Sequence, residues 1–190
     1  LLINLNIKSI YSMLENSIQD RFNAGQGLVR DAGLLALKSF KNRESLVTEK
    51  KGPQDWVSNA DREVEKMIKE RLKLIFPEDN FFGEESGFKQ KNSVGIWVVD
   101  PIDGTSCFLK GLPSWCVSMA YISNNEIEIG LIYAPCTDEL FAAQRGRGAT
   151  LNGQLMCISK ATSLSEGIVG LGYSPASSIK ATQKALSFLF

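Results

Sequence analysis

The stretch WVVDPIDGT, residues 97–105, decides the fold class of this 190-residue chain and points to its chemistry. Its apolar start predicts a buried strand that delivers Asp100 at its carboxyl end. Pro101 has no N–H group, so we expect the strand ladder to stop there. Asp103 follows three residues after Asp100, and Gly104 can open a turn or short helix whose N–H groups face outward and receive an anion.

The two aspartates of this stretch admit two interpretations. Two bare carboxylates ~4 Å apart repel by ~4 kcal/mol at an effective dielectric constant of 20, and a divalent cation turns that repulsion into attraction. Ligation by oxygen alone suits Mg²⁺, which often takes one or two carboxylates together with a substrate phosphate. In the other interpretation Asp103 lies in a plain turn and Asp100 caps a strand end. The spacing alone leaves both open.

A second acidic segment, GEESG at 83–87, follows a short apolar stretch. Standing alone, it is typical of a solvated loop. A sheet, however, gathers strand ends at one edge, so a second carboxylate loop emerging there could meet Asp100 and Asp103. A sheet that brings these ends together would therefore give Glu84 a role beside the two aspartates.

A third acidic residue, Asp61, stands at the start of a predicted helix. Ser58-x-x-Asp61 has the form of a capping box, in which each side chain binds a backbone N–H group of the other residue. In the functional interpretation Asp61 is an acid at a helix start that is aimed at a metal-bound water. The local pattern is explained by the cap alone, so it does not require the second role.

Apolar residues recur at helical spacing in the first third of the chain, over about 7–18 and 28–36. Gly25 and Gly27 fall between these runs, where a separation or bend is expected. Lys-Lys-Gly-Pro at 50–53 is interpreted as a breaker.

The middle of the chain predicts one more helix and then strands. The helix is expected over about 59–76 and ends before Pro77. Asn124 and Asn125 mark a hairpin turn, and the last residues return to a helical pattern over 177–190. Helices packed on a largely antiparallel sheet make an α+β or layered α/β/α domain. The predicted strands are 80–82, 96–99, 117–122, 127–133 and 139–143.

Composition narrows the possible functions. The chain has 21 Lys and Arg against 21 Asp and Glu, so it lacks the basic excess typical of proteins that bind nucleic acid or acidic membranes. It has no histidine, which excludes Ser-His-Asp and Cys-His catalysis and His-ligated zinc. Its four cysteines show no CxxC pair and are too sparse for a disulfide scaffold, so we expect reduced thiols and a cytoplasmic location.

Together the three acidic segments resemble the inositol monophosphatase family of Mg²⁺-dependent, Li⁺-sensitive phosphatases. The resemblance rests on WVVDPIDGTSCF at 97–108, GEES at 83–86 and VSNAD at 57–61. It extends from about residue 15 to 175. Supporting segments are GLP at 111–113 with VS at 117–118, GLIYAP at 130–135, GRGA at 146–149 and LNG at 151–153.

The resemblance implies a set of metal ligands. Glu84, Asp100 and the carbonyl group of Ile102 would hold a first Mg²⁺ ion, and Asp100 and Asp103 would share in a second. Glu84 and Asp61, partly through water, would support a weaker third ion. All of these ligands are oxygen atoms, as the chemistry of Mg²⁺ requires.

The resemblance also implies the catalytic and substrate-binding groups. Asp61 and Thr105 would form a hydrogen-bonded pair that orients and deprotonates the attacking water. Backbone N–H groups of Gly104 and Thr105 would receive the phosphate. Lys50 lies near the position at which family members carry a lysine on a flexible loop. The residues expected to contact the substrate are Glu84, Ile102, Asp103, Gly104 and Thr105.

Family members continue into a region with a WD-x-x-A motif, whose Asp is a further ligand of the second Mg²⁺. This sequence holds no such motif, and Asp138, expected in a hairpin turn, cannot replace that ligand. We therefore expect residues 1–190 to form one inositol-monophosphatase-like domain, truncated before its last metal-ligand motif. The implied fold is the layered α-β-α-β-α sugar-phosphatase fold with its carboxy-terminal part missing, in a homodimer.

The predicted function is Mg²⁺-dependent hydrolysis of a small polyol phosphate monoester of the inositol 1-phosphate type by a metal-activated water. Histidinol-phosphate and 3′-nucleotide hydrolysis are alternatives within the same superfamily. A truncated, metal-binding remnant without turnover is the alternative outside the enzymes. No nucleic-acid or membrane partner is expected.

Overall fold

The computed structural model describes residues 7–52, 55–88 and 95–168, with residues 170, 180, 183, 184 and 187 beyond them. The helices are α1 (Ile7–Lys41), α2 (Asn59–Ile75) and α3 (Thr105–Lys110), with 3₁₀ turns at Arg43–Ser45 and Leu164–Glu166. The strands are β1 (Thr48–Gly52), β2 (Asp55–Ser58), β3 (Asn80–Gly83), β4 (Gly87–Phe88), β5 (Ile96–Asp103), β6 (Cys116–Ser123), β7 (Glu126–Ala134), β8 (Glu139–Gln144), β9 (Gly148–Leu151) and β10 (Gln154–Leu155).

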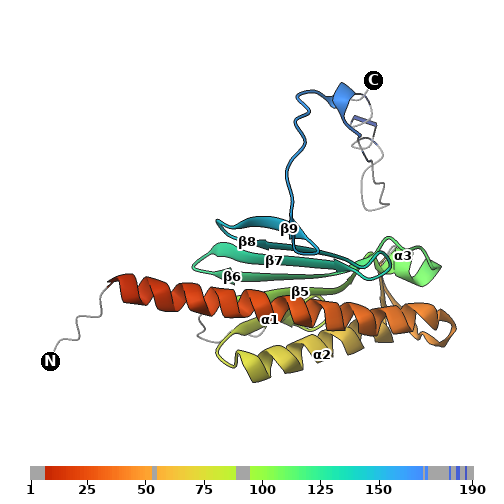
Figure 1. Cartoon of the computed structure of the whole chain (residues 1–190). Coiled ribbons are helices and arrows are strands. Elements are labelled where there is room, and N and C mark those ends of the chain that lie inside the picture. The colour runs from red at the N-terminus through yellow and green to blue at the C-terminus, as the bar shows by residue number, and fades with distance from the viewer. Residues whose placement is uncertain are drawn as a thin grey trace.

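Eight strands form one sheet in the order β10-β9-β8-β7-β6-β5-β3-β4, as Figure 1 shows for its central strands. Neighbouring strands are antiparallel except β3 and β5, which are parallel. Strands β1 and β2 form a separate antiparallel pair that leads into α2. The predicted α+β class, with helices on a largely antiparallel sheet, is confirmed.

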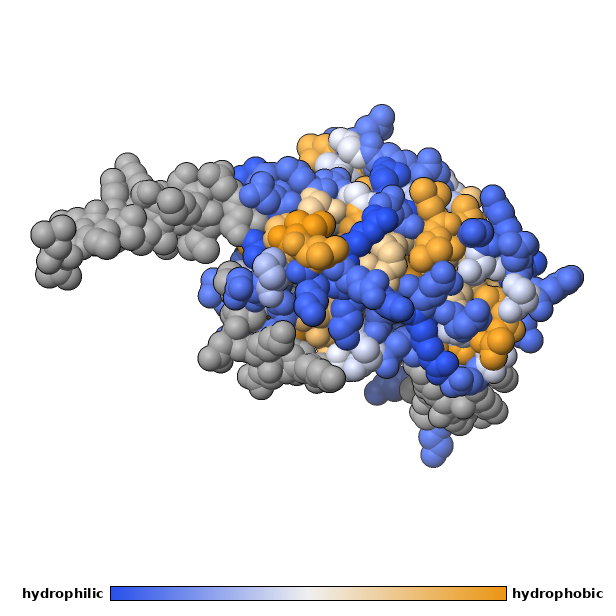
Figure 2. Space-filling model, turned by 90° about the horizontal axis from the view of Figure 1, so that it is seen from below, coloured by the Kyte–Doolittle hydropathy of each residue, from blue (hydrophilic) through white to orange (hydrophobic). Residues whose placement is uncertain are grey.

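The core lies between this sheet and the helices α1 and α2 (Figure 1). Strands β5, β6 and β7 alternate along their length, so that Trp97, Tyr121 and Leu131 are buried. Full burial of one such apolar side chain stabilises the fold by about 2–3 kcal/mol. Seen from below, the molecule is mostly hydrophilic, with separate hydrophobic patches (Figure 2). Some large apolar side chains also remain exposed among the described residues, including Leu74 and Ile158.

Helix α1 runs without a break through Gly25 and Gly27, so the expected separation of two helices is wrong. Gly25 faces the sheet, where an added Cβ would lie 2.6 Å from Cδ1 of Leu131 and 3.1 Å from the ring of Trp97. Glycine at this position lets the helix approach the sheet closely. Nothing lies within 4 Å of a Cβ at Gly27, which faces outward. Packing on the sheet outweighs the low helix propensity of both residues.

Several local predictions are confirmed. Helix α2 begins at Asn59 and ends at Ile75, one residue short of the predicted end, with Pro77 just beyond. Asn124 and Asn125 connect β6 to β7 with φ angles of 50° and 62°, as a type I′ hairpin turn requires. The five predicted strands are present as β3, β5, β6, β7 and β8.

The predicted breaker at 50–53 contains the end of β1 at Gly52, and the register of β1 shifts between Lys50 and Gly52. One local prediction is wrong. Strand β5 continues past Pro101 to Asp103, because a bulge accommodates a residue that has no N–H group to donate. The helix predicted over 177–190 falls almost wholly outside the described residues.

The described residues also bear on the state of the cysteines and on membrane-spanning helices. All four cysteines are unpaired, which agrees with the prediction of free thiols. No helix among the described residues is long and apolar enough to cross a membrane.

Candidate active site

A bulge in β5 brings the two aspartates of the 97–105 stretch to one face of the sheet. Asp100 lies opposite Ser118 of β6, and Asp103 lies opposite Cys116. Three steps along β5 thus match two steps along β6, which marks one extra residue in β5. In a regular strand, side chains three apart point to opposite faces, so the bulge is what places both carboxylates together.

The parallel pairing of β3 with β5 brings Glu84 to the same edge. Gly83 is in register with Val99, and the backbone N–H of Glu84 donates to the carbonyl oxygen of Val99 over 3.1 Å. Gly83 and Val99 are thus partners across the two strands, and Glu84 and Asp100 are the residues that directly follow them. The predicted meeting of the two carboxylate loops is found in the structure. The pocket there is lined by Phe82, Glu84, Val98, Val99, Asp100, Ser118 and Ala120.

Burial and the nearness of other carboxylates both act on the charge of Asp100. The pKa of Asp100 is raised to about 7, first because the carboxyl group is largely buried and then because Glu84 and Asp103 lie nearby. The backbone N–H of Ile102 donates to Oδ1 of Asp100 over 3.1 Å and opposes this rise. Asp100 therefore carries a proton in part of the metal-free molecules at neutral pH.

The structure unites Asp61 and Thr105, which are 44 residues apart in the chain. Asp61 is 2% exposed, and its Oδ2 accepts hydrogen bonds from the backbone N–H of Ser58 over 2.9 Å and from the Ser58 hydroxyl over 2.6 Å. Its Oδ1 lies 3.4 Å from Oγ1 of Thr105. Burial raises the pKa of Asp61, against the hydrogen bonds from Ser58 and Thr105. The capping box is thus present, and the carboxylate reaches a second partner as well.

The Thr105 hydroxyl has a second acceptor in the carbonyl oxygen of Ile102, at 3.0 Å. The preceding residue, Gly104, has φ +91° and is the N-cap of α3. An added Cβ at Gly104 would lie 2.8 Å from the carbonyl oxygen of Ser114, so glycine is required by both conformation and space. This turn carries the Ile102 carbonyl and the Thr105 hydroxyl side by side.

The polar groups of the site are carboxylate, carbonyl and hydroxyl oxygens. Such oxygen atoms are the ligands that a hard divalent cation prefers. Burial, and then the neighbouring Glu84 and Asp103, raise the pKa of Asp100, and a bound cation would favour its charged form. No three His, Cys, Asp or Glu side chains within the described ranges already surround one point. Asp103 is exposed, and the Cys116 thiol donates to its Oδ2 over 3.8 Å. The carboxylates thus lie in one place without forming a closed cage.

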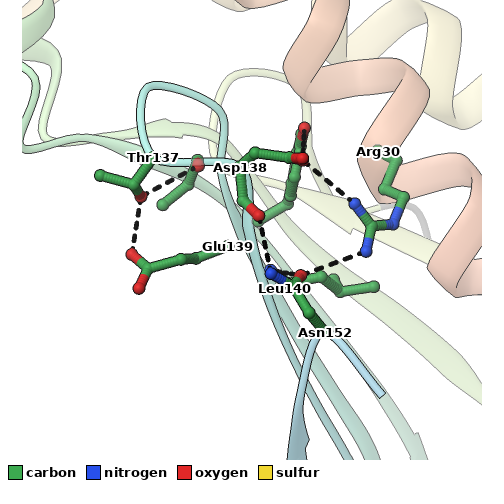
Figure 3. A network of polar contacts seen from close by, with 8 residues as sticks. Arg30, Thr137, Asp138, Glu139, Leu140 and Asn152 are labelled. Atoms are coloured by element: carbon green, nitrogen blue, oxygen red, sulfur yellow. Dashed lines mark hydrogen bonds and ion pairs between the residues drawn. The ribbon is translucent and has the colours of Figure 1, made fainter. Parts of the chain in front are cut away.

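Asp138 lies in a polar network at the β7–β8 turn, whose contacts in Figure 3 include none of the predicted site residues. Its Oδ1 accepts from the Tyr133 hydroxyl over 2.8 Å and from Arg30 of α1 over 3.3 Å. Arg30 also donates to Asn152, whose side-chain NH₂ donates to the carbonyl oxygen of Asp138 over 2.9 Å. As predicted, Asp138 lies in a hairpin turn. Through Arg30, this β7–β8 turn and the β9–β10 turn at Asn152 are both bound to α1.

Two further residues, Trp115 and Cys107, lie close to the site residues in the chain. Trp115 is buried, with its ring 4.9 Å from Phe108 and 5.3 Å from Phe40, so it is a core aromatic. Cys107 of α3 is half-buried and unpaired. One site neighbour was missed: Glu65 of α2, a buried acid four residues after Asp61 that contacts the Glu84 loop.

Comparison with known proteins agrees with this geometry. A model of the inositol monophosphatase family matches residues 18–189. The inositol-1-monophosphatase of Rhizobium meliloti is 38% identical over 163 residues, which cover 85% of this chain and 58% of that protein. The inositol monophosphatase of Dictyostelium discoideum is 37% identical over 166 residues, covering 84% of this chain and 61% of its own.

A solved structure extends the likeness to three dimensions. The extragenic suppressor protein suhB from Bartonella henselae matches with a TM-score of 0.71 and 38% identity, over 73% of this chain and 54% of that one. The chain therefore spans between half and two thirds of the length of these three relatives. With most of its own length matched, the chain belongs to the inositol monophosphatase family.

Proposed function

We propose that this chain supplies the catalytic edge of a Mg²⁺-dependent phosphatase that hydrolyses a small polyol phosphate monoester of the inositol 1-phosphate type. The observation that carries the proposal is the convergence of Asp61 and Thr105 with Glu84, Asp100 and Asp103 at the carboxyl ends of β3 and β5. Two relatives named as inositol monophosphatases support the substrate class.

Glu84, Asp100, Asp103 and the carbonyl group of Ile102 are the groups that would hold the metal. When bound, Mg²⁺ would lower the pKa of a coordinated water and neutralise charge on the phosphoryl oxygens. The protein's own contribution is to keep these oxygen ligands at one edge, where burial and then the neighbouring carboxylates raise the pKa of Asp100. A weaker ion between Glu84 and Asp61 belongs to the same proposal.

Asp61 and Thr105 would orient and deprotonate the attacking water. Thr105 lies between the oxygen atoms of Ile102 and Asp61, so its hydroxyl hydrogen can pass from one acceptor to the other. With a water in place, the hydroxyl oxygen can accept a hydrogen bond from that water while its own hydrogen points to Asp61. As the Thr105 oxygen takes the proton of the water, its own hydrogen would pass to the carboxylate of Asp61, whose position the Ser58 cap fixes.

The substrate phosphate would meet the N–H groups of Gly104 and Thr105 at the start of α3. The positive φ of Gly104 turns the backbone at this point, and an outward N–H pair in such a turn favours a bound oxyanion. The chain has no histidine, and this chemistry would need none, because a metal-bound water would supply the nucleophile and carboxylates would accept protons. We also propose the homodimer that the family resemblance implies, and the cytoplasmic location that the sparse cysteines indicate.

The test is phosphate release by the purified chain with Mg²⁺ from inositol 1-phosphate, histidinol phosphate and a 3′-nucleotide. We expect the highest kcat/KM for inositol 1-phosphate, and a loss of at least about 100-fold in Asp61→Asn, since positioned proton transfer contributes about 10²–10⁴-fold. Glu63→Gln, which changes an exposed acid on the same helix, serves as the control. Preference for another phosphate would change the substrate class.

The competing function is that of a metal-binding remnant without turnover. The observation in its favour is the share of its relatives that the chain spans, 58% in one case. Mg²⁺ binding with no phosphate release from any of the three substrates would support the remnant and contradict hydrolysis by this chain.

A further inference from the structure

One stripe of α2 contacts both loops of the candidate site. Asp61, Glu65 and Lys69 follow one another at intervals of four residues, so they lie along the same side of the helix. Asp61 meets Thr105 of the 97–105 stretch. Glu65 accepts from the backbone N–H of Glu85, and Lys69 donates to the Ser86 hydroxyl over 3.2 Å. A single rigid helix therefore holds both carboxylate loops.

Glu65 is the buried member of this stripe that contacts the Glu84 loop. It is 4% exposed, although it is an acid, and its Oε2 lies 2.8 Å from the backbone nitrogen of Glu85. Its carboxyl group also packs against Gly83. A Cβ added at Gly83 would lie 2.3 Å from Oε2 and 2.4 Å from the carboxyl carbon. The contact thus depends on glycine at 83 and on a long acceptor side chain at 65.

Glu84 lies between the two residues that Glu65 contacts. On one side Gly83 packs against the carboxyl group of Glu65, and on the other Glu85 donates its N–H to it. The backbone N–H of Glu84 itself is bound to Val99 of β5. The backbone on both sides of Glu84 is therefore fixed from α2 and from β5, which limits the positions its side chain can take.

We propose that Glu65 is a positioning residue for the metal centre: it fixes the loop that carries Glu84 without touching metal or substrate. This inference rests on the proposed function, in which Glu84 is a metal ligand. Partners that orient metal ligands affect the metal affinity by about 10–100-fold. Burying a carboxylate is unfavourable unless hydrogen bonds compensate. The hydrogen bond from the N–H of Glu85 therefore also stabilises the buried carboxyl group of Glu65.

The experiment measures Mg²⁺ affinity by titration calorimetry on the metal-free chain. We expect Glu65→Ala to weaken Mg²⁺ binding about tenfold. Glu65→Gln keeps an oxygen acceptor at the same reach, so its affinity should stay within about threefold of the parent. Glu63→Ala on the exposed side of α2 is the matched control and should leave the affinity unchanged. Thermal unfolding of each metal-free variant separates lost affinity from lost fold.

A second pair of variants keeps the test decisive. Glu65→Asp keeps the charge but shortens the side chain by one methylene group, so it should weaken binding even if Glu65→Ala does not fold. Gly83→Ala places a methyl group against Glu65 and should also weaken binding. Because both changes act on one contact, combining Gly83→Ala with Glu65→Ala should cost less than the sum of the two.

The outcomes separate this inference from the function on which it rests. Unchanged Mg²⁺ affinity in folded Glu65→Ala or Glu65→Asp, beside a parent that binds, overturns the positioning role alone. Equal weakening by Glu65→Gln and Glu65→Ala also overturns it, because a charge effect would then replace the contact. Absence of Mg²⁺ binding by the parent chain overturns the metal centre itself.

Discussion

The carboxylate of Asp61 divides its two oxygens between the helix cap and Thr105. Oδ2 accepts both hydrogen bonds from Ser58, while Oδ1 lies 3.4 Å from the Thr105 hydroxyl. The two interpretations that the sequence offered for this acid are therefore compatible. The cap fixes the rotamer of the side chain, and the fixed rotamer presents the second oxygen to the neighbouring loop.

This division predicts different effects for the two partners of Asp61. Ser58→Ala removes the side-chain hydrogen bonds of Ser58 in the capping box, so we expect a loss of about 1 kcal/mol of unfolding free energy with kcat reduced only a few-fold. Asp61→Asn should destabilise by a similar amount but lower kcat by at least about 100-fold. Urea unfolding and steady-state kinetics on both variants measure this, and equal kcat losses would contradict the separation.

The hydroxyl of Thr105 is predicted to matter more than its methyl group. Thr105→Ser keeps the hydroxyl oxygen that lies 3.0 Å from the Ile102 carbonyl, whereas Thr105→Val keeps the shape and loses the hydrogen bond. We expect kcat within about tenfold of the parent for the first and a loss of about 100-fold or more for the second. Similar kcat values for the two variants would rule out the proposed role.

The pKa of Asp100 predicts a pH dependence of Mg²⁺ binding. Its carboxyl group must lose a proton before it binds a cation, and its pKa in the metal-free fold is about 7. Mg²⁺ affinity should therefore rise between pH 6 and pH 8, roughly one unit on each side of that pKa, with release of protons. Calorimetry in buffers of different ionisation enthalpy measures that release. A proton count of zero at pH 6.5, about half a unit below that pKa, would contradict the assignment.

The same shift predicts how the metal-free fold responds to pH. Because the folded-state pKa lies above the unfolded value, folding binds a proton, and the unfavourable contribution of Asp100 grows as pH rises from about 4 to about 7 and is constant above that. Asp100→Asn should remove this slope and stabilise the metal-free chain at pH 8 by on the order of 1–2 kcal/mol, since solvent screens part of the repulsion. Urea unfolding at pH 5 and pH 8 measures the difference. Destabilisation at pH 8 would contradict it.

Two glycines of α1 are predicted to respond oppositely to alanine. Gly27→Ala meets no atom within 4 Å and should stabilise the chain by about 0.5–1 kcal/mol, because alanine has the higher helix propensity. Gly25→Ala forces a methyl group against Leu131 and Trp97 and should destabilise by about 1–3 kcal/mol. Each variant is the control for the other in thermal unfolding. Changes of the same sign would contradict the close approach of α1 to the sheet.

The sequence was most informative where a local pattern is sufficient. Apolar periodicity and Pro77 located α2 to within one residue, and the Asn124-Asn125 pair located a hairpin. It was least informative where tertiary contact decides. The continuity of α1 through Gly25 depends on the sheet beneath it, and the irregular pairing of β1 depends on β2. Neither contact leaves a periodic trace in the sequence.

In the candidate site, too, the sequence identified the residues but not their arrangement in space. The residues of the acidic motifs were found because their spacing and order match a known family. Their geometry depends on a bulge between Asp100 and Asp103 and on the parallel register of Gly83 with Val99, which local sequence does not specify. Glu65 was missed because one acid on a helix is normally exposed, and only the fold shows that it is buried against Gly83.

The most direct test of the account is a Mg²⁺ titration of the metal-free chain and its Asp100→Asn variant at pH 8, followed by calorimetry. If Glu84, Asp100 and Asp103 form a metal centre, the parent chain binds Mg²⁺ and the variant binds it at least about tenfold more weakly. Equal affinity of the parent and the variant, or no binding by the parent, would contradict the central claim that these carboxylates hold the metal.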